Sequence, residues 1–308
     1  MQTNNIQTTT DCPPPPLIRF RSKNYHFASP LLLTDNLEQS KNLSDLKSEI
    51  NLLIENKKST GEITTASVYV RRLSDSNWFS LNDEQTYTPA SLMKVPIMMT
   101  FLKRSQKEPG LLEREIFFNP EWVKYAPSQS FTEKQIAPGK TYKMKDLLYA
   151  MVVNSDNYAT MLLNKGLDIT EFKNLFTSIG LTEPDVRNPK YDITVSGYSK
   201  FMRLLYNATY LSDENSDYAL WMLSEGSFKE GMLKQLPEGV KVAHKFGEFG
   251  ESDKGSLKQL HESGIIFFNN NPILITIMTK GTDVKKLPEV INEIAKHIYD
   301  RMNVTSKV

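Results

Sequence analysis

A serine and a lysine three residues apart, Ser91 and Lys94, begin the apolar run "ASLMKVPIMM". Residues at positions i and i+3 of a helix share one face, so both side chains can point into one pocket. Burial makes a lysine lose its proton more easily, and the neutral amine can then take the proton of a serine hydroxyl. The pair fits a nucleophilic serine with a lysine base. On this pattern alone, a small residue early in an ordinary helix is the simpler interpretation.

The residues before Ser91 predict where that helix begins. Thr88 is a suitable N-cap, and Pro89 is favoured as a first helical residue. Ser91 would then lie in the first turn, where free backbone N–H groups and the helix dipole stabilise a developing oxyanion.

A second polar group, Ser155-Asp156-Asn157, interrupts a helical pattern after the apolar run "LLYAMVV". Such a break can be a plain helix end in which serine or aspartate caps the next helix. In a functional interpretation, the Ser155 hydroxyl relays a proton to a leaving group and Asn157 binds a substrate carbonyl. Asp156 would point inward as a structural acceptor.

A third group, "AHKFGE", lies on a predicted strand and contains Lys245 and Gly247. A lysine at the end of a strand is usually a solvated edge charge. Alternatively, Lys245 holds an anionic substrate group, and Gly247 lets substrate approach the backbone. The backbone N–H of Glu248 would then be a second oxyanion donor beside that of Ser91.

Hydrophobic periodicity predicts the elements that position these groups. An amphipathic helix at residues 43–58 precedes a hairpin from about 65 to 84, and helical patterns dominate from about 89 to 223. Strands return from about 239, and a last helix closes the chain at 287–302. We therefore predict an α+β fold: a five-stranded antiparallel sheet flanked by N- and C-terminal helices, plus an all-helical lobe.

The predicted organisation is one two-lobed domain at 36–308 behind a polar, proline-rich arm at 1–35. The sheet lobe takes about 36–88 and 238–308, and the helical lobe takes about 89–237. A cleft between two lobes is the natural place for a site. Within the arm, "SPLLL" is either an added edge strand or a loop that covers apolar surface.

Composition excludes several classes of protein. The 37 basic and 36 acidic residues leave a net charge of +1, which favours neither nucleic acid nor an anionic membrane. The single cysteine, Cys12, allows no intramolecular disulfide, and no apolar run is long enough to span a bilayer. The four histidines show no metal-ligand spacing, so we expect no metal and no cofactor.

Taken in order, Ser-x-x-Lys, Ser-Asp-Asn and Lys-x-Gly resemble the motifs of the class A β-lactamases and the penicillin-recognising D,D-peptidases. The resemblance runs from about residue 35 to 305 and includes "NSDNYATMLL" and "HESGIIFF". It implies the two-lobed fold and an acyl-serine mechanism. It assigns Ser91 as nucleophile, Lys94 as its activator and Ser155 as proton shuttle, while Asn157 and Lys245 bind substrate.

The resemblance implies hydrolysis of β-lactams as the first expected activity. The alternatives are a D,D-peptidase that acts on peptidoglycan peptides and a sensor that binds β-lactams with slow or no turnover. The expected partner is a β-lactam or a peptidoglycan peptide, and we expect a monomer. Such substrates lie outside the cytoplasm, so we expect export, although the N-terminus lacks the apolar region of a signal peptide.

Two positions depart from the family. The segment between Gly180 and Asp192, where class A enzymes carry the glutamate that activates the deacylating water, is short. Glu183 is its candidate base, although a turn residue before a proline is the plainer interpretation. Phe246 replaces the family's threonine or serine, and strand alternation turns it away from the side of Lys245.

The histidines next to the third group are also ambiguous. His244 precedes Lys245, and His261 lies on the neighbouring predicted strand. A structural pair of these two histidines is the simpler hypothesis. A role of His244 in tuning Lys245 is the alternative.

Overall fold

The computed structural model describes residues 17–22, 28–125, 131, 134–185, 191–250, 256–268 and 271–304. Most of the expected N-terminal arm, including its proline run, lies outside these ranges. Within them, no helix is both long and apolar enough to cross a membrane.

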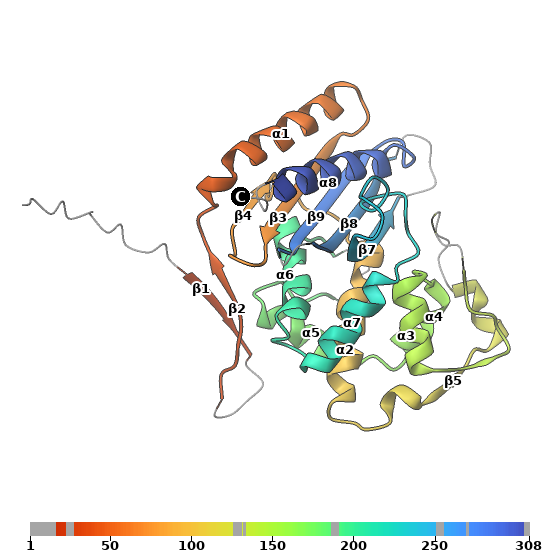
Figure 1. Cartoon of the computed structure of the whole chain (residues 1–308). Coiled ribbons are helices and arrows are strands. Elements are labelled where there is room, and N and C mark those ends of the chain that lie inside the picture. Colours follow the sequence, from red (N-terminus) through yellow and green to blue (C-terminus); the bar gives the residue numbers. More distant parts are fainter. Residues whose placement is uncertain are drawn as a thin grey trace, which may run out of the picture.

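A five-stranded antiparallel sheet forms the upper half of the molecule (Figure 1). Its strand order is β4-β3-β9-β8-β7, which confirms the predicted pairing of the first hairpin with the three late strands. The strands are β3 (Thr65–Arg72), β4 (Trp78–Leu81), β7 (Lys241–Phe249), β8 (Lys258–Phe267) and β9 (Ile273–Gly281).

Helices cover both faces of the sheet. The predicted N- and C-terminal helices, α1 (Ser44–Ser59) and α8 (Leu287–Val304), pack on one face (Figure 1). Their buried residues and those of the sheet form one apolar core. On the other face, α6 (Val195–Tyr206) contacts β3, β8 and β9 and joins the sheet to the core of the helical lobe.

The helical lobe occupies the middle of the chain, as predicted. Helix α7 (Asp213–Ser224) was not among the segments that periodicity identified, because its sequence "DENSDYALWMLS" mixes polar residues into the apolar pattern.

The other elements of the helical lobe are η2 (Ala90–Met93), α2 (Lys94–Ser105), η3 (Leu111–Glu113), β5 (Glu115–Phe117), η4 (Pro120–Tyr125), β6 (Thr141–Lys143), α3 (Met144–Val153), α4 (Asn157–Asn164) and α5 (Ile169–Ser178).

Two strands near the N-terminus form a small antiparallel sheet of their own. Strand β2 (Leu31–Asn36) pairs with β1 (Leu17–Arg21) and not with the main sheet, and a 3-10 turn, η1 (Lys41–Leu43), leads from it to α1. Leu32 and Leu33 are buried in the core of the helical lobe. The leucines of "SPLLL" therefore belong to a strand, but not to an added edge strand of the main sheet. Leu32 and Leu33 cover apolar surface, as the other alternative expected.

Candidate active site

Ser91 lies in a tight 3-10 turn, and the α-helix proper starts at Lys94. The predicted cap is wrong: the Thr88 hydroxyl instead donates to Asp192 Oδ1 over 3.0 Å, and η2 has no side-chain cap. Ala90 has a φ of 49°, a left-handed conformation that a residue with a side chain adopts only when its surroundings enforce it. The turn thus holds the nearly buried Ser91 in a conformation that a regular helix start would not give.

Lys94 is 3% exposed and donates three hydrogen bonds. Its Nζ lies 2.6 Å from the carbonyl oxygen of Ser155, 3.1 Å from Ser155 Oγ and 2.8 Å from Asn157 Oδ1. Burial lowers its pKa to about 7, although the Asp156 carboxylate opposes that shift. The pKa of Lys94 therefore lies near neutral pH, which suits a group that has to take up and release a proton.

The break between α3 and α4 caps a helix, as predicted, and also places a hydroxyl among the site residues. Asp156 caps α4 by accepting from the N–H groups of Tyr158 (2.7 Å) and Ala159 (3.0 Å), and it also accepts from Ile136 N (2.5 Å). Ser155 has a φ of 54°. This left-handed residue turns its hydroxyl toward the lysines, so capping and site geometry come from one short segment.

Lys245 is no solvated edge charge, because it is only 2% exposed. Its Nζ donates to Ser155 Oγ over 3.0 Å and to the carbonyl oxygen of Phe246 over 3.1 Å. Burial lowers the pKa of Lys245 and the charge of Lys94 lowers it further, while Glu262 acts in the opposite direction. The structure thus joins Lys94, Ser155, Asn157 and Lys245 in one hydrogen-bonded cluster.

Gly247 brings the end of β7 against the turn that carries Ser91. A Cβ atom at this position would lie 2.4 Å from the carbonyl oxygen of Pro89 and 3.0 Å from Leu92 N, so only glycine fits without movement. Glu248 follows directly on β7. Its backbone is therefore beside the Ser91 turn, where the second oxyanion donor was predicted.

Phe246 belongs to the core. It is 2% exposed, stacks on Phe228 with 4.4 Å between ring centroids, and contacts Phe131 edge-on. Lys245 Nζ nevertheless lies 4.1 Å from the centroid of the Phe246 ring. The ring replaces a hydroxyl donor with an aromatic face that favours the lysine cation.

Glu183 lies outside the hydrogen-bonded cluster. Its side chain is 49% exposed and forms an ion pair with Lys173 on α5. Asp192, at the end of the same loop, accepts the hydroxyl of Thr88 three residues before Ser91. The described part of this loop is therefore fixed to the site at its end but turns its candidate base toward solvent.

The two histidines of the sheet do not pair with each other. His261 Nε2 lies 3.2 Å from the carbonyl oxygen of Thr88, and its Nδ1 accepts from Thr279 N. Burial lowers the pKa of His261 to about 3, so it is neutral. His244 Nδ1 lies 2.6 Å from Oε1 of Glu262, a residue that the sequence analysis missed. Its only signal was a carboxylate in the middle of a predicted strand.

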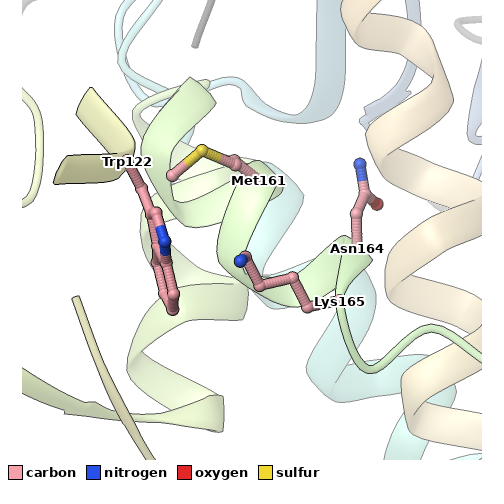
Figure 2. A pocket seen from close by; sticks show the side chains of 4 residues that line it. All are labelled: Trp122, Met161, Asn164 and Lys165. Atoms are coloured by element: carbon pink, nitrogen blue, oxygen red, sulfur yellow. The ribbon is translucent and has the colours of Figure 1, made fainter. Parts of the chain in front are cut away.

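A shallow hollow of about 360 Å3 on the helical lobe is lined by none of the predicted site residues. Figure 2 shows Trp122 facing Lys165, whose Nζ lies 3.3 Å from the centroid of the ring. The contact is a cation–π pair between η4 and the residue that follows α4, with Met161 and Asn164 beside it.

Comparison with known protein families matches residues 45–302 to the β-lactamase enzyme family. The chain belongs to this family. It is a serine β-lactamase-like hydrolase, as the order of the three motifs predicted. Among curated proteins no match was found.

Solved structures of class A β-lactamases and of the penicillin-binding protein PBP-A have the same fold. PBP-A aligns with a TM-score of 0.71 at 20% identity, over 85% of this chain and 97% of its own. The extended-spectrum β-lactamase TLA-1 aligns at 0.69 and 21%, over 85% and 99%. A β-lactamase from Chitinophaga pinensis aligns at 0.69 and 17%, over 84% and 99%.

Proposed function

We propose that the protein forms an acyl-enzyme on Ser91 and that its first substrates are β-lactams. The observation that carries this proposal is the position of Ser155 Oγ, which accepts a hydrogen bond from Lys94 on one side and from Lys245 on the other. The Ser155 hydroxyl lies between two buried lysine side chains, and the pKa of one of them, Lys94, is near neutral. A hydroxyl in this position is suited to moving a proton during acyl transfer.

In the proposed acylation, Ser91 Oγ attacks the lactam carbonyl carbon and its proton passes to the free amine of Lys94. The pKa of about 7 makes Lys94 both a base at neutral pH and an acid once it is protonated. The carbonyl–nitrogen bond then breaks. The leaving nitrogen takes its proton through the Ser155 hydroxyl, which Lys94 and Lys245 both contact.

Substrate contacts follow from the same cluster. Lys245 is the proposed partner of the anionic group of the substrate, and Asn157 offers its amide to a substrate carbonyl. The N–H groups of Ser91 and Glu248 are the proposed oxyanion donors, because Gly247 brings β7 against the Ser91 turn.

The second candidate function is a penicillin-binding D,D-peptidase or a sensor with slow turnover. The exposure of Glu183 and its ion pair with Lys173 favour it, since a base must reach the acyl group to activate water. One structure with the same fold is a PBP-A mutant, described as an acyl-enzyme complex with penicillin G. A chain that acylates well and hydrolyses slowly would also accumulate such an acyl-enzyme.

Both candidate functions use substrates that occur outside the cytoplasm, so we propose that the protein is exported. This proposal depends on the substrate class and not on any feature of the fold. Fractionation of the native host with an antibody to the protein tests it. Recovery only with cytoplasmic markers contradicts it.

One experiment separates the candidate functions. The protein is mixed with a chromogenic cephalosporin, and intact mass spectra are taken over time. Sustained colour with little adduct indicates a β-lactamase, whereas a persistent adduct with little colour indicates a peptidase or a sensor. Neither colour nor adduct contradicts the acyl-serine proposal.

The chain offers a matched control for this experiment. Ser91→Ala must abolish colour and adduct alike. Ser44 begins the other Ser-x-x-Lys of the chain, with Lys47, and it is exposed at the start of α1. Ser44→Ala is therefore expected to leave both signals unchanged.

A further inference from the structure

The turn that carries Ser91 needs a hydrogen-bond donor that its own helix does not supply. In a regular helix the carbonyl oxygen of Leu92 would accept from the N–H group four residues later. Residue 96 is a proline, which has no N–H group. The N–H of Lys94, two residues away, is shared between this oxygen and that of Ser91. Leu92 is fully buried, so water cannot take the place of the missing donor.

Tyr198 on α6 supplies this donor. Its hydroxyl donates to the carbonyl oxygen of Leu92 over 2.9 Å, and its side chain is fully buried. Burial raises the pKa of Tyr198 well above its ordinary value, so the hydroxyl keeps its proton at every pH at which acylation is measured. No step of the proposed acylation uses Tyr198.

The other end of the turn is held in a similar way. The Nδ1 atom of His261 accepts from Thr279 N, so its Nε2 carries the proton and donates to the carbonyl oxygen of Thr88 over 3.2 Å. Thr88 N in turn donates to Gln259 Oε1 over 3.2 Å. Groups from β8 therefore fix Thr88, and a group from α6 fixes Leu92 at the opposite end.

Ala90 lies midway between these two fixed residues and is the strained residue of the turn. A φ of 49° is unfavourable for a residue with a side chain and persists only where the surroundings enforce it. The hydrogen bonds at Thr88 and Leu92 are such restraints. If one of them is lost, Ala90 is free to return to a right-handed conformation, which would move Ser91 and its backbone N–H group.

We propose that Tyr198 is a positioning residue of the acyl-transfer site, because its hydrogen bond to Leu92 holds the turn that presents Ser91. The inference rests on the proposed function, in which Ser91 is the acylated nucleophile. Leu92 also faces β7, since a Cβ atom at Gly247 would lie 3.0 Å from its N atom and 3.1 Å from its Cγ atom. Tyr198 therefore fixes Ser91 relative to the strand that carries the second proposed oxyanion donor.

The first test is the rate constant of acylation of Tyr198→Phe by a fluorescent penicillin at saturating concentration. This variant keeps the ring and loses only the hydroxyl. The rate constant should fall by roughly tenfold to a hundredfold, the range that corresponds to backbone strain of this kind. Its dependence on pH should not change, because Lys94 is still the base. Loss of folded protein alone would lower the labelled fraction and leave the rate constant as it is.

Tyr210→Phe is the matched control. Tyr210 is also nearly buried, and its hydroxyl donates to Glu171 on α5 and not to the Ser91 turn. Its rate constant should stay within about threefold of that of the unchanged protein. A Tyr198→Phe rate constant inside the same range overturns the proposal, and so does an equal slowing in Tyr210→Phe.

A second test uses the strain of the turn itself. Glycine adopts a left-handed conformation without the cost that a side chain brings, so Ala90→Gly makes the turn depend less on its surroundings. The slowing caused by Tyr198→Phe should therefore be at least about threefold smaller in the Ala90→Gly background. An equal slowing in both backgrounds would show that Tyr198 does not act through the turn, and it overturns the proposal.

The donor at the Thr88 end gives a further variant. His261→Phe removes this donor, and the acylation rate constant should fall, but by less than in Tyr198→Phe, because Thr88 keeps its hydrogen bond to Gln259. This variant decides the proposal if Tyr198→Phe does not fold. An unchanged rate constant in His261→Phe would then show that the restraints of the turn do not matter for acylation.

A last readout needs no substrate. The N–H of Leu92 donates to the carbonyl oxygen of Pro89 over 3.0 Å inside the turn, so its hydrogen exchange reports whether the turn stays closed. Exchange in the peptide around Leu92 should be roughly tenfold faster in Tyr198→Phe and unchanged in Tyr210→Phe. Equal exchange in the two variants overturns the proposal. If the unchanged protein is not acylated at all, the proposed function fails, and this readout alone decides whether Tyr198 holds the turn.

Discussion

The acylation cluster and the loop between α5 and α6 are built in opposite ways. In the cluster, Lys94, Ser155 and Lys245 are buried and joined by hydrogen bonds of 3.0 to 3.1 Å at one hydroxyl. In the loop, Glu183 is 49% exposed and its partner is a surface lysine, Lys173. The proposed acylation therefore has a preorganised cluster of buried groups, whereas the described residues of the loop show no comparable arrangement around Glu183.

The physical basis of the difference is burial. A buried lysine responds strongly to its surroundings, and the pKa of Lys94 falls to about 7. An exposed ion pair is screened by water and contributes little. Changes in the cluster should therefore have large effects on acylation, and changes in the loop should have small ones.

The largest effect is expected for Lys94→Arg. An arginine stays charged at every accessible pH and cannot accept the proton of Ser91, so acylation should slow by roughly a hundredfold to ten-thousandfold. The rate is followed by intact mass spectrometry with a β-lactam. Lys103→Arg on the same helix keeps a donor to the carbonyl oxygen of Tyr210 and is the matched control. A Lys94→Arg rate within threefold of the original would remove Lys94 from the role of base.

The second effect concerns pH. Lys94 acts as a base only when it is neutral, so acylation should rise with pH, be half-maximal near pH 7 and fall about tenfold per unit well below that value. The same single-turnover assay in buffers from pH 5.5 to 8 measures this limb. A rate that is flat over this range would show that the proton acceptor is another group.

The third effect compares two helix caps. Asp156 accepts from three backbone N–H groups in the buried site, whereas among the described residues Asp168 accepts from Glu171 N alone, at the exposed start of α5. Asp156→Ala should lower the free energy of unfolding by roughly 2 to 4 kcal/mol, because buried donors lose their acceptor. Asp168→Ala should cost about 1 kcal/mol. Urea denaturation at pH 7 measures both, and equal losses would contradict the contrast between the two regions.

The sequence predicted the regular parts of this molecule and its central motifs. Periodicity predicted the strands of the main sheet and most helices, and the order of the motifs brought Lys94, Ser155 and Lys245 together before any geometry was known. The misses have local causes. Thr88 does not cap a helix, because the strained Ala90 opens a 3-10 turn instead. Strand β1 was hidden in a polar segment, since its pairing with β2 leaves most of it exposed.

Glu262 shows a different limit of sequence analysis. A carboxylate in the middle of strand β8 was visible, but its partners come from β7 and from the backbone at Met232. Neither contact follows from spacing along the chain. Pattern analysis finds residues that share an element, whereas a buried polar pair depends on how separate elements pack.

The smallest effect is expected for Glu183→Gln, which tests the loop directly. Because Glu183 is exposed and paired with Lys173, its loss should leave the lifetime of the acyl-enzyme within twofold of the original. Lys173→Met breaks the same ion pair from the other side and should behave alike. The lifetime is measured by following adduct loss on Ser91 after excess β-lactam is removed. A tenfold longer lifetime in Glu183→Gln, but not in Lys173→Met, would make Glu183 the deacylation base and would require the loop to close over the site during turnover.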